Sequence, residues 1–170
     1  MVEKFKKSLL VVATIFGLVS LLMIFCPAIV FDVEELADIE MNLGIEGLKI
    51  TFGWELMDME VFEFSFLSFL TYLLPIAGIV CIVYSEKKSD KRIYYVAIAC
   101  FAVAALLFFL APSLIQYAKK EVKKELKDYI TLGAGAIIGA ISCAISALCV
   151  FFHIKNEEQK TAQSQVTEAN

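Results

Sequence analysis

The chain has 170 residues, of which 59% are hydrophobic and 20% are charged, with a formal net charge of −4. Its mean hydropathy is +0.75, and its apolar content exceeds the roughly 45–50% that is usual in soluble domains. These values exclude a soluble fold, because so short a chain cannot cover several helices that are apolar on every face.

Four long apolar segments set the predicted fold class. They lie at about residues 8–30, 64–84, 93–115 and 131–153, and none contains Asp, Glu, Lys or Arg. A hydrocarbon core about 30 Å thick needs roughly 20 apolar residues as a helix. The sequence therefore predicts an all-α membrane protein, a four-transmembrane-helix bundle in which residues 1–153 form one membrane domain. The polar residues 154–170 are predicted to be a disordered cytoplasmic tail.

The first segment is predicted to be an uncleaved anchor, because its apolar stretch is longer than a signal-peptide core and no Ala-x-Ala site follows it. Orientation follows the distribution of Lys and Arg around the spans. With both termini in the cytoplasm, nine of these residues lie on the inner side and six on the outer side. We therefore expect a multi-pass protein of the plasma membrane with cytoplasmic N- and C-termini.

The first outer loop, residues 31–63, is strongly acidic: ten Asp and Glu against one Lys give it a net charge of −9. Apolar residues alternate on both sides of residues 44–47, first in 37–43 and then in 48–56. Period two around a turn that contains Gly predicts a β-hairpin. Residues 29–33 and 61–64 are candidate additional strands. We therefore expect a small extracellular β-sheet, built from this loop, over the bundle.

The second outer segment, residues 116–130, contains lysines and glutamates at helical spacing. This pattern predicts an amphipathic helical extension of the third span. It is either a solvated helix face or a basic surface that contacts the acidic loop, anionic lipid or a polymer. Exposed ion pairs contribute only about 0–1 kcal/mol each, so charge complementarity alone does not decide between these readings.

The fourth span carries a row of small residues, namely Gly135, Gly139, Cys143 and Ala147. In lipid, such rows allow helix backbones to approach closely. The row is expected to form either an internal seam of the bundle or a dimer interface, and the internal seam is favoured because each helix must contact two neighbours.

Residues for catalysis or for cofactor and metal binding are not evident in the sequence. The spans contain no ionisable pair of the kind that marks a proton or ion path. The only histidine, His153, has no clustered cysteine or carboxylate partners, and no Gly-x-Ser-x-Gly turn occurs. We therefore expect a protein that is not an enzyme, has no cofactor and does not bind nucleic acid.

In topology the chain resembles claudins and other tetraspan proteins, with four spans, inner termini, and a β-rich first loop longer than the second. The claudin first loop has Gly-Leu-Trp and two cysteines, whereas this chain has Gly47-Leu48, a separate Trp54 and no loop cysteine. The chain is more similar to uncharacterised small four-span membrane proteins of low-GC Gram-positive bacteria. That likeness is carried by Phe64-Ser65-Phe66-Leu67, Ala111-Pro112-Ser113 and Leu132-Gly133-Ala134-Gly135-Ala136, and it implies a bacterial source but no activity.

The expected function is that of a structural or interaction protein, surrounded by the lipid bilayer and in contact with a membrane-protein partner or with copies of itself. The alternative is a small transporter or an oligomeric channel subunit, lined by Thr14, Ser20, Ser68, Thr71, Ser142 and Ser146. Candidate partner-contact residues are Lys119, Lys120, Lys123, Lys124, Asp38, Glu40 and Trp54, and the helix-packing candidates are the small residues of the fourth span. Trp54 is expected to be a core residue of the sheet or an interfacial anchor.

Overall fold

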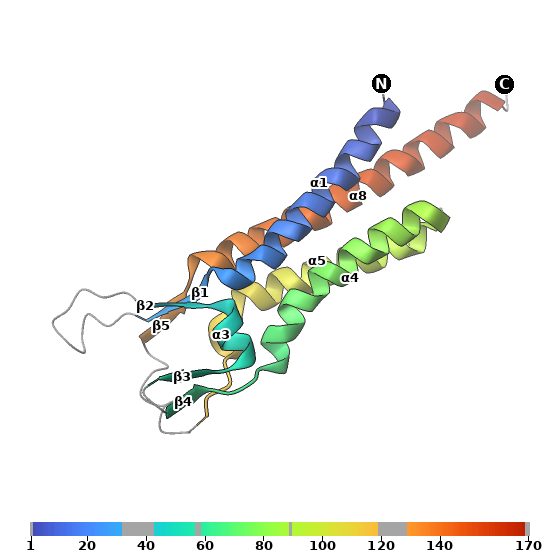
Figure 1. Ribbon diagram of the computed structural model, residues 1–170. Helices are drawn as coiled ribbons and strands as arrows, with labels where there is room; N and C mark the ends of the chain where they lie inside the picture. Colours follow the sequence, from blue (N-terminus) through green and yellow to red (C-terminus); the bar gives the residue numbers. More distant parts are fainter. Residues whose placement is uncertain (1, 32–42, 57–58, 89, 119–128, 169–170) are drawn as a thin grey trace.

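A computed structural model describes residues 2–31, 43–56, 59–88, 90–118 and 129–168 of the chain. Figure 1 shows an elongated bundle of long helices whose N- and C-termini lie at one end, while the labelled strands lie at the other. We call these the termini end and the sheet end.

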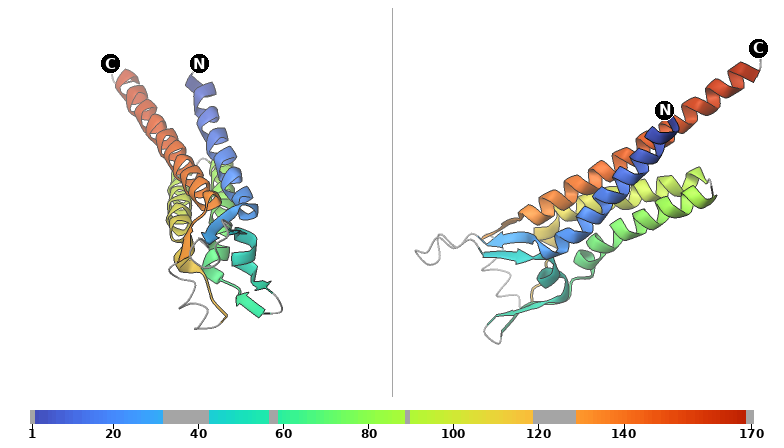
Figure 2. Two further views of the ribbon diagram at one scale, coloured as in Figure 1. Left: turned by 90° about the vertical axis from the view of Figure 1, so that its left-hand side faces the viewer. Right: turned by 45° about the horizontal axis from the view of Figure 1, so that its top comes forward.

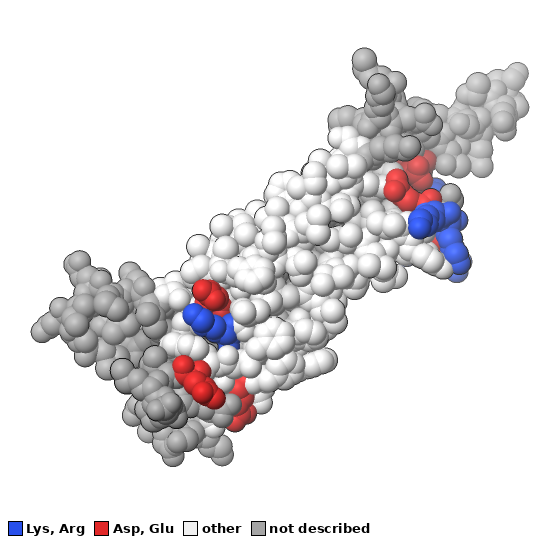
Figure 3. All heavy atoms as spheres, in the orientation of Figure 1, with Lys and Arg blue, Asp and Glu red and all other residues white. Residues whose placement is uncertain are grey.

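Four long helices form the bundle: α1 (Val2–Leu22), α4 (Phe66–Lys88), α5 (Lys91–Phe109) and α8 (Ala134–Glu168). Each coincides with a stretch of 18 residues or more that is apolar enough to cross a membrane, although the first stretch, Ser8–Phe25, runs past the end of α1. The predicted number of membrane-length helices is thus confirmed. In Figure 3, a broad surface without Lys, Arg, Asp or Glu separates charged residues near the two ends of the molecule.

The helices close into a ring of neighbours. Helix α8 packs against α1 and α5, α5 packs against α4, and α1 contacts α4 over a smaller area. In Figures 1 and 2, α8 continues past the ends of α4 and α5 at the termini end. The first and last helices of the chain are therefore neighbours along one side of the bundle.

Large aromatic residues of α5 fill the centre of the bundle. Tyr94, Phe101 and Phe108 are buried at intervals of seven residues, with buried alanines between them. This spacing keeps one face of a helix toward its neighbours. Phe101 lies against Gly17 of α1 and Gly78 of α4, because a Cβ atom at either glycine would come within 3.1 Å of its ring. The absence of side chains at the two glycines thus leaves the space that the Phe101 ring occupies.

The first apolar run does not remain helical to residue 30. Helix α1 ends at Leu22, a single turn η1 (Met23–Phe25) follows, and Pro27–Phe31 form strand β1. Cys26 is extended, with φ −99° and ψ 158°, which is the conformation that a following proline favours. Pro27 has no N–H to continue the helix, so the hydrophobic run changes from helix to strand at this point.

Strand β1 is the central strand of a three-stranded antiparallel sheet in the order β2-β1-β5. Strand β2 (Leu43–Glu46) precedes a short helix, and β5 (Ile130–Leu132) leads into α8. In register, Phe31 lies opposite both Leu43 of β2 and Ile130 of β5. The sheet therefore joins the ends of α1 and α8, which confirms a small sheet but shows that it draws strands from both loop regions.

The predicted hairpin around residues 44–47 is wrong. Residues Gly47–Phe52 form helix α3, and the hairpin of this loop is instead β3 (Trp54–Leu56) with β4 (Met59–Phe62). Helix α3 buries Gly47, Ile50 and Thr51 and leaves Leu48 and Phe52 exposed. Because apolar residues occupy both faces, the period-two pattern did not distinguish a strand from a helix. The predicted strand residues 37–42 lie outside the described residues.

The expected helical extension of the third span is also wrong where the structure describes it. Helix α5 ends at Phe109, and a short helix α6 (Ala111–Leu114) with Pro112 near its start follows. Tyr117 then forms a bridge to Phe62 in an antiparallel arrangement. The proline and the partner strand explain why the helix does not continue. Residues 119–128, which carry most of the predicted pattern, lie outside the described residues.

The prediction of a disordered polar tail is wrong, because α8 continues as a helix to Glu168. Residues 154–168 include Lys, Glu, Gln and Ala, all of which favour helix, and contain neither Gly nor Pro. Propagation of an existing helix needs no new nucleus. Low hydrophobicity therefore did not predict the absence of a helix.

Candidate functional site

Two segments of opposite net charge are attached to neighbouring strands at the sheet end. Residues 32–42 contain five carboxylates and no basic residue, and residues 119–128 contain five lysines and three carboxylates. The acidic segment begins directly after Phe31, and the lysine-rich segment ends two residues before Ile130. Phe31 and Ile130 are antiparallel partners in the sheet. One end of each segment is thus fixed beside the other.

A row of three aromatic rings fixes the other end of the lysine-rich segment. Trp54 of β3 lies opposite Phe62 of β4, with 6.1 Å between ring centroids, and Phe62 meets Tyr117 edge-on at 5.8 Å. The N–H of Glu63 donates to the carbonyl of Gln116 at 2.9 Å. Burial raises the pKa of the Tyr117 phenol. The chain immediately before residue 119 is therefore bound to the β3-β4 hairpin.

Of the predicted partner-contact residues, only Trp54 lies among the residues that the structure describes. Trp54 is half-buried in this aromatic row, which places it in the small hairpin as a packing residue. The charged candidates lie outside the described residues: Lys119, Lys120, Lys123, Lys124, Asp38 and Glu40.

The small residues of α8 face the inside of the bundle. A Cβ atom at Gly135 would lie 2.8 Å from the Cβ of Cys26, and one at Gly139 would lie 2.7 Å from the Phe108 ring. Cys143 is fully buried and Ala147 is half-buried. Gly135 and Gly139 thus make close contacts within one copy of the chain.

A small cavity lies where α3 covers the sheet end of α4 and α5. Its polar lining comes from Thr51 of α3 and from Ser68, Thr71 and Tyr72 of α4, and Phe108 of α5 also lines it. The free volume is about 10 Å³, which is enough for about one water molecule. The Tyr72 hydroxyl lies against Gly47, so that a side chain at residue 47 would collide with it. A cavity of this volume is too small for an organic substrate.

Of the six hydroxyl groups expected to line a transport path, those of Thr14, Ser20, Thr71 and Ser146 donate to backbone carbonyls, and that of Ser68 donates to the Ser65 hydroxyl. Thr14 donates to Leu10 at 2.9 Å and Thr71 donates to Leu67 at 3.0 Å, in each case within one helix. Ser146 of α8 donates at 2.9 Å to the carbonyl of Ala13 on α1. Hydrogen bonds of this kind hold helices together in lipid. A path lined by these groups within one copy would have to break them.

At the termini end, polar groups organise the turn between α4 and α5. The Ser85 hydroxyl donates to the Asp90 carbonyl at 2.7 Å, and the Asp90 carboxylate accepts from the Arg92 N–H at 3.0 Å. His153 packs edge-on against Tyr94, with 5.2 Å between ring centroids. Across the described part of the chain, no group of three metal-ligating side chains comes together.

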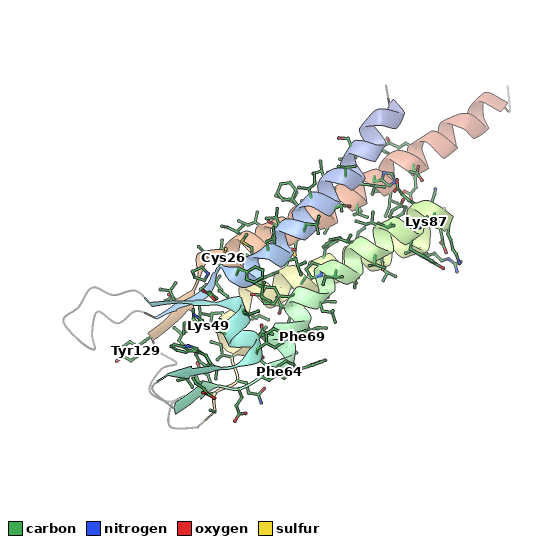
Figure 4. The ribbon with its side chains drawn as sticks, in the orientation of Figure 1. Cys26, Lys49, Phe64, Phe69, Lys87 and Tyr129 are labelled. Atoms are coloured by element: carbon green, nitrogen blue, oxygen red, sulfur yellow. The ribbon has the colours of Figure 1, made fainter. Side chains whose placement is uncertain are left out.

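Sequence reasoning missed a cluster of three phenylalanine rings at the junction of α3 and α4. Phe52, Phe64 and Phe69 lie with centroids 6.1–6.2 Å apart in all three pairs, and Figure 4 labels Phe64 and Phe69 beside α3. We call these residues the phenylalanine cluster. The available signal was Phe64-Ser65-Phe66 at the start of the second span, but Phe52 joins the cluster only because residues 47–52 are helical.

No protein-family model matches this sequence, and no curated protein matches it either. Function is therefore inferred from the geometry of the chain itself.

Proposed function

We propose that this chain is an integral plasma-membrane protein of structural or interaction type, with cytoplasmic termini. Its sheet end lies outside the cell and contacts a partner protein or a surface polymer through the acidic and lysine-rich segments. The chain performs no chemistry of its own in this role, and its bundle serves to hold the two segments in place.

The observation that carries the proposal is the pairing of Phe31 with Ile130. It joins two segments that are about 100 residues apart in sequence and carry opposite net charge. A protein that needed only four helices in lipid would not require both loops to start from one sheet. Charged segments on a fixed scaffold give specificity and fast association with a complementary partner.

A second support is the number of independent contacts that hold the scaffold. The N–H of Gly47 donates to the Cys26 carbonyl at 3.2 Å, and the N–H of Ser65 donates to the Thr51 carbonyl at 3.0 Å. The Ser65 hydroxyl in turn donates to the Leu114 carbonyl at 2.7 Å. Both loops are thus linked to each other and to the helix ends, as a preorganised binding surface requires.

The structure gives a sharp test by removal of the acidic segment. Because Phe31 and Leu43 are partners in register, residues 32–42 can be replaced by Asn-Gly, which closes a two-residue hairpin. A deletion of residues 37–56 would instead remove β2 and α3 and damage the bundle. The second variant carries Lys119→Gln, Lys120→Gln, Lys123→Gln and Lys124→Gln. The matched control is Lys155→Gln, at the termini end of α8.

Each variant is purified from its native host in mild detergent, and the proteins that accompany it are identified by mass spectrometry. We expect one defined partner to accompany the unaltered chain and the Lys155 variant and to be lost from both loop variants. Retention of every partner by both loop variants, with the fold intact by circular dichroism, would refute the proposal.

Orientation is tested separately with fusions to the C-terminus, next to α8. A cytoplasmic C-terminus predicts a fluorescent green fluorescent protein fusion and an inactive alkaline phosphatase fusion. The opposite pair of results would place the sheet end in the cytoplasm and remove the extracellular partner from the proposal.

A further inference from the structure

We infer that α3 lies in the outer face of the lipid bilayer, with Leu48, Phe52 and the phenylalanine cluster in contact with acyl chains. This makes α3 a membrane-associated element in addition to the four spans. The inference rests on the proposed membrane placement and adds the identity of the surface that α3 touches.

The first argument is the exposure pattern of α3. Gly47, Ile50 and Thr51 face the bundle, whereas Leu48 and Phe52, four residues apart on the opposite face, are 38% and 56% exposed. Phe64 and Phe66 beside them are also exposed. Each phenylalanine leaves roughly 100 Å² of apolar surface uncovered, since a phenylalanine side chain buries about 150–250 Å² in full. A patch of a few hundred square ångströms marks an interaction surface.

The second argument is continuity with the surface of α4 that faces away from the bundle. Leu73, Ile76, Val80 and Val83 are exposed along α4 at intervals of three and four residues. Phe66 and Phe69 continue this row at the sheet end. Phe69 is only half-buried, and the rings of Phe52 and Phe64 each lie 6.1 Å from it. Helix α3 is thus placed on the row that must contact lipid if α4 crosses the membrane.

The third argument is depth. Helix α4 spans 23 residues from Phe66 to Lys88, and its charged residues begin at Glu86. A hydrocarbon core about 30 Å thick takes about 20 residues, so counting back from Ser85 places Phe66 at the outer edge. Phe69 is one turn further in, about 4–5 Å at 1.5 Å per residue. Phe52, which packs on it, then lies about 10 Å from the bilayer centre.

The fourth argument is that the backbone N–H and C=O groups at the ends of α3 have hydrogen-bond partners within the chain. Polar backbone groups are tolerated at membrane depth only where the protein supplies their hydrogen bonds. Both ends of α3 are supplied from within the chain: Gly47 donates to Cys26, and the Thr51 carbonyl accepts from Ser65. The Thr51 hydroxyl also donates to the Gly47 carbonyl at 2.8 Å. Lys49 is 44% exposed beside Glu46 and is thus accessible to headgroups.

The test uses the fact that Trp54 is the only tryptophan. In a Trp54→Phe background, single tryptophans are introduced as Phe52→Trp, Leu48→Trp and Ile76→Trp. Ile76 is the membrane control, because ten residues from Phe66 put it about 15 Å inside, near the bilayer centre. Glu55→Trp is the water control, on an exposed residue of β3. Each variant is reconstituted in phosphatidylcholine vesicles, with circular dichroism as the check on folding.

Fluorescence quenching is measured with lipids brominated at carbons 6 and 7 or at carbons 11 and 12, and with iodide on both sides of the vesicle. We expect tryptophan at residues 52 and 48 to be quenched more by the shallow than by the deep bromolipid, and several-fold less by iodide than tryptophan at residue 55.

Quenching of residues 48 and 52 by iodide but not by bromolipid would overturn the inference and place α3 in water. Quenching of residues 48 and 52 by neither agent would also overturn it, since a second copy or a partner protein would then cover α3. Either result, with residue 76 quenched by the deep bromolipid, leaves the membrane placement intact. Failure of residue 76 to be quenched would overturn the membrane placement and the inference together.

Discussion

The contact between Gly78 and Phe101 allows a quantitative test of how the bundle is held together. In Gly78→Ala, the new Cβ atom would lie 2.8 Å from Cζ and 2.9 Å from Cε2 of Phe101. Carbon atoms in contact prefer about 3.5–4.0 Å, so the ring or a helix must move by most of an ångström. Overpacking of this kind costs about 1–3 kcal/mol, and the gain in helix propensity offsets about 0.5–1 kcal/mol of it.

We therefore expect Gly78→Ala to lower the free energy of unfolding by about 1 kcal/mol. Gly17→Ala should lower it less, because its Cβ would lie 3.1 Å from the same ring. Ala102→Leu, which adds more volume on the exposed face of α5, is the matched control and should change stability by less than about 0.5 kcal/mol. Unfolding is followed in mixed micelles of increasing SDS fraction by Trp54 fluorescence.

The physical cause is isolated by a double-mutant cycle with Phe101→Leu, which shortens the side chain that the new methyl group meets. If the steric contact is the cause, the two substitutions together should be about 1 kcal/mol less destabilising than the sum of the single effects. A coupling energy below about 0.5 kcal/mol, or a stabilising Gly78→Ala, would refute the packing described for this layer.

Three further predictions concern other layers of the molecule. Ser146→Ala removes the hydroxyl that donates to the Ala13 carbonyl at 2.9 Å and should destabilise the bundle by about 0.6 kcal/mol in the same SDS assay, with about 1.7 kcal/mol as the upper limit. Gly47→Ala should distort the sheet end, because its Cβ would collide with the Tyr72 hydroxyl and would lie 2.8 Å from Cζ of the same ring; Trp54 fluorescence should change, and adding Tyr72→Leu, which removes both atoms, should restore it. Burial raises the pKa of Tyr117, so the folded state holds the phenol proton more tightly than the unfolded state does. The free energy of unfolding is therefore unaffected by this group below about pH 10 and decreases as the pH rises further. An ultraviolet titration of the unaltered chain minus Tyr117→Phe should show a tyrosine that ionises above its usual range, and a normal midpoint would contradict its burial.

The four spans were predictable because about 20 consecutive apolar residues admit few other structures. Their ends were not. Ile29 and Val30 are as apolar as the helix before them, and hydropathy does not separate an apolar strand from the last turns of an apolar helix. The start of α8 was shifted for the same reason, since Ile130–Leu132 form β5. Only Pro27 and Gly133 indicated the changes of structure.

The candidate site was harder to predict, because its elements depend on contacts between distant parts of the chain. Residues 48, 50, 52 and 54 have the alternation of a strand, yet in a membrane protein an apolar residue is not necessarily a buried one. Leu48 and Phe52 are exposed, while Ile50 is buried. Phe62 pairs with Tyr117, and Phe31 pairs with Ile130. Neither pairing could be predicted from the residue pattern of one segment taken alone.

The strand pairing between β1 and β5 also sets the order in which the molecule can be completed. The Thr131 hydroxyl bonds to the carbonyl of Val30, 101 residues earlier in the chain. At about 5–20 residues per second, a ribosome takes on the order of 5–20 s to make the intervening chain. Throughout that interval β1 has an open edge on the side that β5 will occupy. A chain truncated before β5 would keep that edge permanently, so the strand that leads into the last helix completes a sheet begun just after the first helix.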